Sequence, residues 1–334
     1  MVLTSCLDGL YSNNISTGDI EWRFLPVEGS NQQNSFKATP AICRNLVVVT
    51  DTLGNLYCIE LENGKLVWMR SEYSTRNDSI CIANESIYSR YAFTESGDIQ
   101  HGIASISLDG SLLWSYFGKS PIRTRSCSID ENRLVFGDMD GILHCLDSRS
   151  GELIWKKDIV EFVQPVDIPK KFLNQEISFV GFPLISRSVV VVSSNDRRNI
   201  LGLDLQTGEL KWHHLVDQDL EGVSSAFHMT SDGEEFWYLV KDNLRSVDMA
   251  SGHVQTKFII ADNYLGRSRS IESVIVGVHL FAAFDESRCI AALNLQTGSL
   301  DWIEQCESGF AAGCIWAHEK LFAGDDQGTI YCYQ

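Results

Sequence analysis

The stretch LYCIELENGKLVW, residues 56–68, decides the fold, because variants of it recur along the whole chain. Each copy alternates apolar and polar residues and passes through a glycine in a short polar segment before its last apolar run. Short apolar runs bounded by turn residues are typical of β-strands, and glycine supplies the positive φ that a tight hairpin needs. The other copies are 10–22, 103–114, 143–155, 201–212, 244–256 and 291–302.

The copies end in Gly-x-x-x-Trp, except that Thr256 replaces the tryptophan after Gly252. Successive copies lie 41 to 57 residues apart. A period in the forties fits a four-stranded β-propeller blade. We therefore expect an all-β propeller of seven four-stranded blades, with six or eight as the alternatives. The motif residues are Gly18, Gly64, Gly110, Gly151, Gly208 and Gly298, and Trp22, Trp68, Trp114, Trp155, Trp212 and Trp302.

The chain starts and stops within a copy of the repeat. Residues 310–334 have the pattern of three strands, and the N-terminal segment supplies an outermost strand that ends at Trp22. A blade shared between the two termini would close the ring and remove its free sheet edges. We therefore expect residues 1–334 to form a single domain closed by such a blade. Residues 10–14 also look like a third strand, so an irregular closure is the alternative.

Composition limits the partners. The net charge of −17 disfavours nonspecific binding to nucleic acid or to an anionic membrane, which would repel the chain at long range. No stretch approaches the roughly 20 apolar residues of a transmembrane helix. The N-terminus has neither a basic nor an apolar signal segment, which predicts a cytoplasmic protein. However, Leu3-Thr4-Ser5-Cys6 resembles a lipoprotein cleavage box, so a periplasmic lipoprotein is the alternative for a trimmed N-terminus.

The segments LDSRSGELIW (146–155), LDLQTGELKW (203–212) and LNLQTGSLDW (293–302) resemble the tryptophan-docking motif of pyrroloquinoline-quinone-type, or quinoprotein-like, propeller repeats. The resemblance covers essentially the whole chain. It implies that each motif tryptophan stacks on the glycine peptide of a neighbouring blade. The tryptophans and glycines given above are therefore expected to be structural.

The dehydrogenases of this family hold a quinone over a vicinal disulfide, beside calcium. The present sequence has no Cys-Cys pair and no room for the additional segments of those enzymes. The resemblance is therefore to the cofactor-less branch of the family, whose members act as interaction scaffolds. We expect no cofactor.

The ten cysteines follow the repeat rather than a metal-ligand spacing such as C-x-x-C. Three of them share a repeat position that elsewhere holds Ser, Gly or Ala, and a cysteine packs there as a small apolar residue. Three others fall in predicted innermost strands, where a thiol site near the centre of the ring is the alternative to packing. The two sets are Cys58, Cys145 and Cys332, and Cys81, Cys127 and Cys314.

Two further motifs could suggest a metal site. Asp138-Met139-Asp140-Gly141 starts like a calcium loop, but the later acidic ligands are missing, so hairpin turn chemistry is the better explanation. His213-His214 follows Trp212 in a predicted connecting loop and has no recognisable third ligand. No nucleophile elbow, P-loop or H-E-x-x-H motif is present. The sequence therefore predicts no metal site and no catalytic residues.

The most suggestive functional signal is basic. Six cations precede the predicted innermost strands, whose leading loops would converge on one mouth of the central channel. They could form a positive funnel for a carboxylate, a phosphate or an acidic peptide. Alternatively, they neutralise nearby acidic side chains. The six are Lys37, Arg76, Arg123, Arg125, Arg267 and Arg269.

These observations favour a non-catalytic scaffold that holds a partner protein, or an anionic small ligand, at the propeller mouth. A bacterial scaffold and a toxin-immunity type protein are both examples of this class. The alternative is an enzyme, a hydrolase or lyase that acts on an anionic substrate in the channel. A weaker alternative is an envelope lipoprotein scaffold of the barrel-assembly type. The long connection from Lys156 to about Ile177 could carry recognition or could cap the ring.

Overall fold

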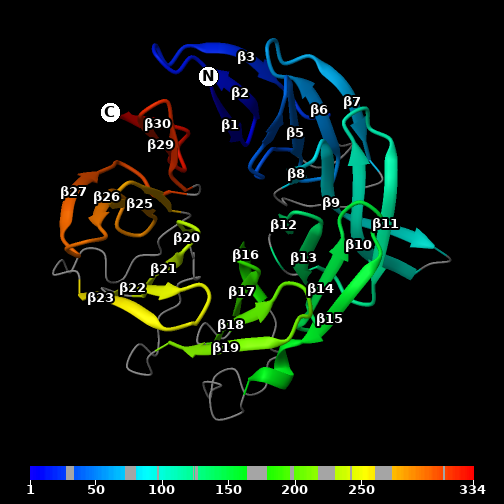
Figure 1. The fold of residues 1–334 in the computed structure, drawn as a ribbon. Coiled ribbons are helices and arrows are strands. Elements are labelled where there is room, and N and C mark those ends of the chain that lie inside the picture. The colour runs from blue at the N-terminus through cyan, green and yellow to red at the C-terminus, as the bar shows by residue number, and fades with distance from the viewer. Residues whose placement is uncertain are drawn as a thin grey trace. The chain divides into compact units, whose positions relative to one another are not determined.

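The computed structural model describes eight antiparallel sheets, which are the blades of a β-propeller fold (Figure 1). The chain divides into two compact units, residues 1–158 and 159–334. The single domain expected over residues 1–334 stays a prediction. The described residues are 1–27, 34–71, 80–95, 98–122, 124, 127–163, 179–195, 199–216, 230–240, 243–259, 273–310 and 313–334.

Unit 1 contains blades 1 to 4, numbered in chain order, and the strands of each sheet pair in sequence order. Blade 1 holds β1 (Val2–Cys6), β2 (Gly9–Asn13) and β3 (Ile20–Phe24), and blade 2 holds β4 (Ala41–Cys43), β5 (Leu46–Thr50), β6 (Leu56–Glu60) and β7 (Leu66–Arg70). Blade 3 holds β8 (Cys81–Ala83), β9 (Ser86–Glu95), β10 (Asp98–Ser107) and β11 (Leu112–Gly118), and blade 4 holds β12 (Ser128–Asp130), β13 (Arg133–Gly137), β14 (Ile142–Asp147) and β15 (Leu153–Asp158).

Unit 2 begins with a short 3-10 helix, η1 (Ile159–Phe162), and contains blades 5 to 8. Blade 5 holds β16 (Phe179–Ser186), β17 (Val189–Ser194), β18 (Asn199–Asp204) and β19 (Leu210–Leu215), and blade 6 holds β20 (Thr230–Ser231), β21 (Glu235–Val240), β22 (Asn243–Asp248) and β23 (Val254–Ile259). Blade 7 holds β24 (Val274–Val276), β25 (His279–Phe284), β26 (Cys289–Asn294) and β27 (Leu300–Gln305), and blade 8 holds β28 (Ile315–Ala317), β29 (Lys320–Gly324) and β30 (Ile330–Tyr333).

The prediction of seven blades, with one shared between the termini, was wrong. The N-terminal segment is a complete three-stranded sheet, in which β1 pairs with β2 from Val2↔Asn13 to Cys6↔Gly9. The C-terminal strands β28–β30 form another three-stranded sheet. The Gly-x-x-x-Trp pattern ends in the outermost strand of a blade. It therefore marks only the blades in which that strand is present. The described strands of blade 8 do not include it, so the pattern does not count this blade.

The cleavage-box resemblance at Leu3–Cys6 also has a structural explanation. These residues belong to β1, where Leu3 packs on the core around Leu10 and the Ser5 hydroxyl donates a hydrogen bond to the Ala38 carbonyl at 2.7 Å. Cleavage before Cys6 would remove this strand from the sheet. Cys6 is the last residue of β1 and is partly buried.

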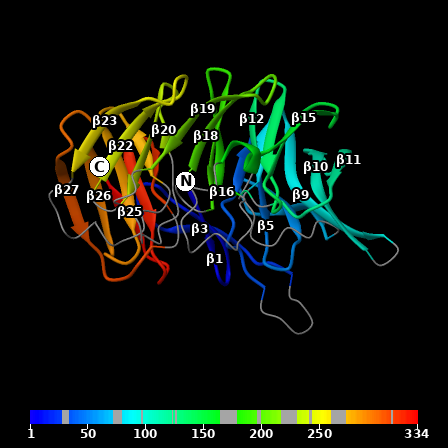
Figure 2. The same ribbon diagram turned by 90° about the horizontal axis from the view of Figure 1, so that it is seen from below.

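The second strand of a typical blade is buried on both faces, as its β-branched run predicts. Val47, Val48 and Val49 of β5 are fully buried, and so is the corresponding part of β17. Figure 2 shows the sheets of each unit standing side by side, with successive hairpins at the two ends of the blades. No helix among the described residues is long and apolar enough to cross a membrane.

At five junctions between consecutive blades of a unit, an aromatic ring of one blade lies on a glycine of the next blade. Trp22 lies over Gly64 so closely that a Cβ added to that glycine would stand 2.7 Å from the indole. The Trp22 indole N–H donates to the Leu61 carbonyl at 2.9 Å. Trp68 lies over Gly110, Trp114 over Gly151 and Trp212 over Gly252, and these indoles donate to the carbonyls of Leu108, Ser148 and Met249.

Blade 6 makes the same contact with a different residue. Thr256 occupies the tryptophan position, but Phe258, two residues further along β23, covers Gly298 of blade 7. A Cβ on Gly298 would stand 2.3 Å from the Phe258 ring. Residues i and i+2 share one face of a strand, so the phenylalanine can replace the tryptophan from the same face. Sequence analysis missed Phe258 because it compared a single column of the repeat.

The small-residue position of the repeat lies directly across from the tryptophan. Cys58 pairs with Trp68, and Gly202 pairs with Trp212. A Cβ on Gly202 would collide with the Trp212 indole at 2.0 Å. The paired indole leaves little space at this position, which explains why the repeat holds only small residues there. Cys58 and Cys145 are fully buried there, as packing residues would be.

We predict that Trp212→Ala lowers the free energy of unfolding by about 3–5 kcal/mol, since it removes a large buried ring and leaves a cavity. Trp212 is 8% exposed, donates to Met249 and stacks on Phe236. Urea denaturation followed by circular dichroism measures the loss. Lys211→Ala is the matched control, because the neighbouring Lys211 side chain is exposed and makes only a 3.6 Å ion pair with Asp204. Equal midpoints for the two variants would contradict the assignment of Trp212.

Candidate functional site

Three blades carry a buried aspartate just after their second strand. Asp51, Asp138 and Asp325 each form an isolated β-bridge with a residue of the segment that leads into the same blade. The three bridge partners are apolar residues, namely Phe36, Ile122 and Phe310. Each aspartate thus fixes the hairpin between the second and third strands and the leading segment beside it.

Asp51 shows how the carboxylate is satisfied. Its Oδ1 accepts hydrogen bonds from the backbone N–H groups of Leu53 and Asn55 at 2.9 and 2.8 Å. Its Oδ2 accepts from the Tyr57 hydroxyl at 2.7 Å and from the Asn34 amide at 2.6 Å. Burial and the bond to this carboxylate raise the pKa of Tyr57. The buried charge is therefore fully hydrogen-bonded, as a buried carboxylate must be.

Asp138, the first residue of the motif that resembles a calcium loop, fixes the corresponding hairpin in blade 4. Its Oδ1 accepts from the Ile142 N–H at 2.8 Å, and its Oδ2 lies 2.9 Å from Nε2 of the buried His144. The other ring nitrogen of His144 lies 3.1 Å from the Tyr116 hydroxyl of blade 3. Asp140 is exposed in the same turn. Turn chemistry therefore accounts for the motif, and the described residues contain no cluster of three potential metal ligands.

The two adjacent histidines lie in a strand and not in the loop that the sequence predicted. His213 and His214 belong to β19, so their side chains point to opposite faces of the sheet. His213 Nε2 lies 2.7 Å from the Asn199 side-chain oxygen, and His214 Nε2 lies 2.8 Å from the Tyr238 hydroxyl. Opposite orientations exclude a shared metal ion at this pair.

Of the predicted basic residues, the structure describes only Lys37. This residue is exposed and follows Phe36, the bridge partner of Asp51. It therefore lies at the end of blade 2 that carries the hairpin between the second and third strands, which we call the hairpin end of a blade. The basic mouth stays a prediction. Arg76, Arg123, Arg125, Arg267 and Arg269 lie outside the described residues, as does most of the connection from Lys156 to Ile177.

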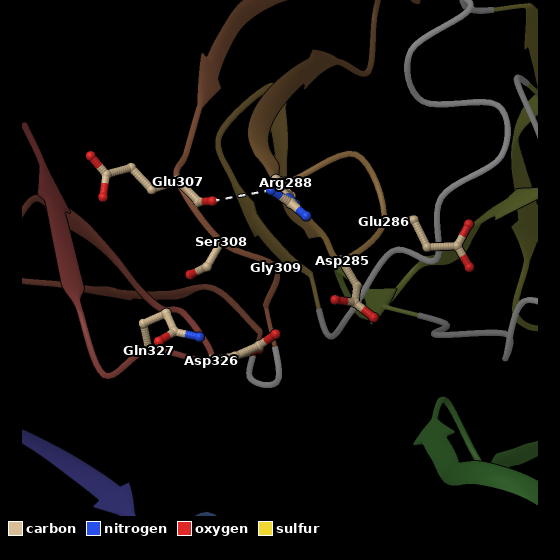
Figure 3. A pocket seen from close by; sticks show the side chains of 8 residues that line it. All are labelled: Asp285, Glu286, Arg288, Glu307, Ser308, Gly309, Asp326 and Gln327. Atoms are coloured by element: carbon tan, nitrogen blue, oxygen red, sulfur yellow. Dashed lines mark hydrogen bonds between the residues drawn. The ribbon is translucent and has the colours of Figure 1, made fainter.

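A polar hollow of about 620 Å³ opens at the same end of the blades in unit 2 (Figure 3). It lies between the turn that follows β25, the segment that follows β27 and the turn that follows β29. The segments FDESR (284–288) and GDDQG (324–328) have the sequence pattern of ordinary turns, and this pattern does not show that they face one space. The lining residues are Asp285, Glu286, Arg288, Glu307, Ser308, Gly309, Asp326 and Gln327.

Gly309 lets two carboxylates approach each other in this hollow. A Cβ at this position would stand 2.3 Å from Asp285 Oδ1 and 3.2 Å from Asp326 Oδ2. A backbone hydrogen bond joins two of the segments that line the hollow, since the Asp326 N–H donates to the Gly309 carbonyl at 2.9 Å. Arg288 Nη1 lies 3.4 Å from the Glu307 carbonyl, which it faces in Figure 3. The described lining residues carry four carboxylates and one guanidinium, and this excess of negative charge suits a cationic side chain and disfavours an anion.

The repeat and its docking contacts define a class, the β-propellers built from quinoprotein-type repeats. The family model described as outer membrane protein assembly factor BamB matches residues 2–90 and 100–334, and the chain belongs to this family. It is 30% identical over 165 residues to BamB of Legionella pneumophila, covering 48% of this chain and 41% of the relative. It is 24% identical over 170 residues to BamB of Taylorella asinigenitalis, covering 47% and 42%. These matches thus span under half the length of the curated relatives.

Solved structures show the same fold at low sequence identity. The crystal structure of BamB from Moraxella catarrhalis superposes with a TM-score of 0.69 at 15% identity, covering 100% of this chain and 94% of that one. A europium-containing methanol dehydrogenase superposes with a TM-score of 0.70 at 10% identity, covering 99% and 79%. The dehydrogenase subunit of the quinone alcohol dehydrogenase of Komagataeibacter europaeus matches 31% of this chain but only 15% of its own length, at 28% identity.

We predict that Asp138→Ala lowers the free energy of unfolding by about 3 kcal/mol, because the Ile142 N–H and His144 lose a charged, buried partner. Asp140→Ala, in the same turn, should change it by no more than about 0.5 kcal/mol. Chelation with EDTA should leave the melting temperature of the wild type unchanged. Equal effects of the two substitutions, or a lower melting temperature in EDTA, would show that the loop has a role other than the hairpin contact.

Proposed function

We propose that this chain is a non-catalytic, protein-binding scaffold that serves outer-membrane protein assembly. The observation that carries this proposal is the match of the assembly-factor family model to residues 2–90 and 100–334. Its relatives in Legionella and Taylorella bear the name of an outer membrane protein assembly factor. The weaker of the sequence-based alternatives, an envelope scaffold of the barrel-assembly type, is therefore preferred over an unspecified scaffold or a toxin-immunity protein.

The same relatives favour an envelope location over the cytoplasm. The cytoplasmic prediction depended on the missing signal segment, and the comparisons give it no support. A protein that assists outer-membrane assembly works in the envelope. The Leu3–Cys6 segment does not contribute to this proposal, since it forms β1.

The alternative function is that of a dehydrogenase-type enzyme. The small extent of the match to the quinone alcohol dehydrogenase argues against this function. The quinone alcohol dehydrogenase match covers less than a third of this chain and a small part of that enzyme. Among the described residues, the lining of the polar hollow consists of carboxylates, one arginine, a serine, a glutamine and a glycine. This set can bind a charged surface through complementary charge.

We place the contact surface at the hairpin end of the blades. Loops held by a rigid scaffold commonly carry recognition, and here the buried aspartates fix the hairpins. The exposed Lys37 and the acidic hollow both lie at this end of their blades. A cationic patch of a partner protein would fit the acidic hollow of unit 2. An anionic ligand would depend on the predicted basic residues, because the hollow repels anions.

Deletion of the native gene tests the assembly role. We expect the abundance of outer-membrane β-barrel proteins in isolated envelopes to fall, and the wild-type gene to restore it. The folded triple variant Arg123→Glu/Arg125→Glu/Arg267→Glu should restore it poorly, because charge reversal opposes docking at the predicted basic loops.

Arg149→Glu serves as the control, since Arg149 is exposed in the turn that precedes the outermost strand of blade 4. This variant should restore the barrel proteins fully, and melting curves should show both variants folded. Unchanged abundance of barrel proteins after deletion would refute the assembly role. Full restoration by the triple variant would refute only the basic surface.

A further inference from the structure

The propeller brings the same two positions together at successive blade junctions. One position begins the innermost strand of a blade, and the other precedes the innermost strand of the next blade. Ala41 and Ile80 share a core cluster at the junction of β4 and β8. Val274 and Cys314 share another at the junction of β24 and β28.

Cysteines fill both positions between blades 3 and 4. Cys81 begins β8, and Cys127 precedes β12, the strand adjacent to β8. Both residues belong to the core cluster around Tyr88 and Leu134. The repeat that places an apolar pair in contact elsewhere therefore places two thiols in contact here.

The thiols of Cys81 and Cys127 differ in exposure, and the surroundings of Cys81 favour its thiolate form. Cys81 is partly exposed, whereas Cys127 is 8% exposed. A hydrogen bond from Cys127 lowers the pKa of Cys81 despite the opposing effect of burial. By contrast, burial raises the pKa of Cys58 to about 11 and that of Cys145 to about 12. Since the thiolate is the nucleophile, Cys81 is better suited to attack than these packing cysteines.

We propose that Cys81 and Cys127 are a modification site, a dithiol that forms a disulfide across the innermost strands of blades 3 and 4. The oxidant is a small-molecule disulfide, RSSR. The Cys81 thiolate attacks one sulfur of RSSR, forms a mixed disulfide and releases RS⁻, which takes up a proton. The Cys127 thiolate then attacks the Cys81 sulfur and releases the second RSH. Two protein thiols are oxidised, and RSSR is reduced to two RSH.

The disulfide would add a covalent link between two blades that otherwise meet through side-chain packing and hydrogen bonds. The crosslink closes the chain between Cys81 and Cys127 into a loop, which restricts the unfolded state. An oxidised protein should therefore be more stable than the reduced one. All ten cysteines lie in the described residues and carry thiols, so the structure corresponds to the reduced form. The inference does not depend on the proposed assembly function.

The test uses the purified full chain and defined mixtures of reduced and oxidised glutathione. After alkylation of the remaining thiols, non-reducing proteolysis and mass spectrometry identify the linked peptides. We expect a Cys81–Cys127 link that forms in oxidised glutathione and disappears in reduced glutathione. The melting temperature should rise by roughly 5 °C or more with the link.

Cys81→Ala should abolish the link and the rise in melting temperature, and it should fold because Ala41 fills the equivalent position in blade 2. Cys58→Ala, the matched control at a buried cysteine, should retain both, since Ala292 fills its equivalent position in blade 7. The inference is overturned if both thiols of the wild type are alkylated at every glutathione ratio. It is also overturned if Cys81 retains glutathione without linking to Cys127, or if either cysteine pairs elsewhere.

Discussion

The structure depends on one repeated contact, an aromatic ring that lies on a glycine of the next blade. The ring fills the space that a side chain at the glycine would need, and the indole N–H satisfies a carbonyl of the same turn. Apolar burial alone would let neighbouring sheets slide, because it has no direction. The hydrogen bond and the close approach fix their spacing. Blade 6 retains the contact through Phe258 although the tryptophan is lost, which indicates that the ring is the essential element.

Most of the fold could be predicted from the sequence, because the repeat places strands, hairpins and docking residues by spacing alone. The blade count could not, since the marker column lies at the outermost strand and the described strands of blade 8 do not include it. The candidate site was harder to predict. Asp285, Gly309 and Asp326 are distant in sequence and belong to turns with an ordinary local role, so only their packing reveals a common hollow. The paired thiols Cys81 and Cys127 were expected in innermost strands, but their contact arises between blades.

In a scaffold of this kind, the residues that stabilise the fold differ from those that recognise a partner. Rings and buried aspartates hold the blades and their hairpins, which leaves the residues at the hairpin end available for a partner. Under the proposed function, that partner would be a protein of outer-membrane assembly. The acidic hollow of unit 2 would then favour one orientation of a cationic partner surface, because complementary charge favours one orientation over others.

Gly151→Ala compared with Gly18→Ala tests the central contact most directly. Both glycines lie in unit 1 with φ near +75°, at +74° and +79°, so alanine strains the backbone equally at the two positions. Only at Gly151 would the new Cβ meet an indole, 2.5 Å from Trp114, whereas at Gly18 it meets nothing within 4 Å. We expect Gly151→Ala to lower the free energy of unfolding by about 1–3 kcal/mol more than Gly18→Ala, as measured by urea denaturation. Equal losses would contradict the view that rings on glycines hold the blades together.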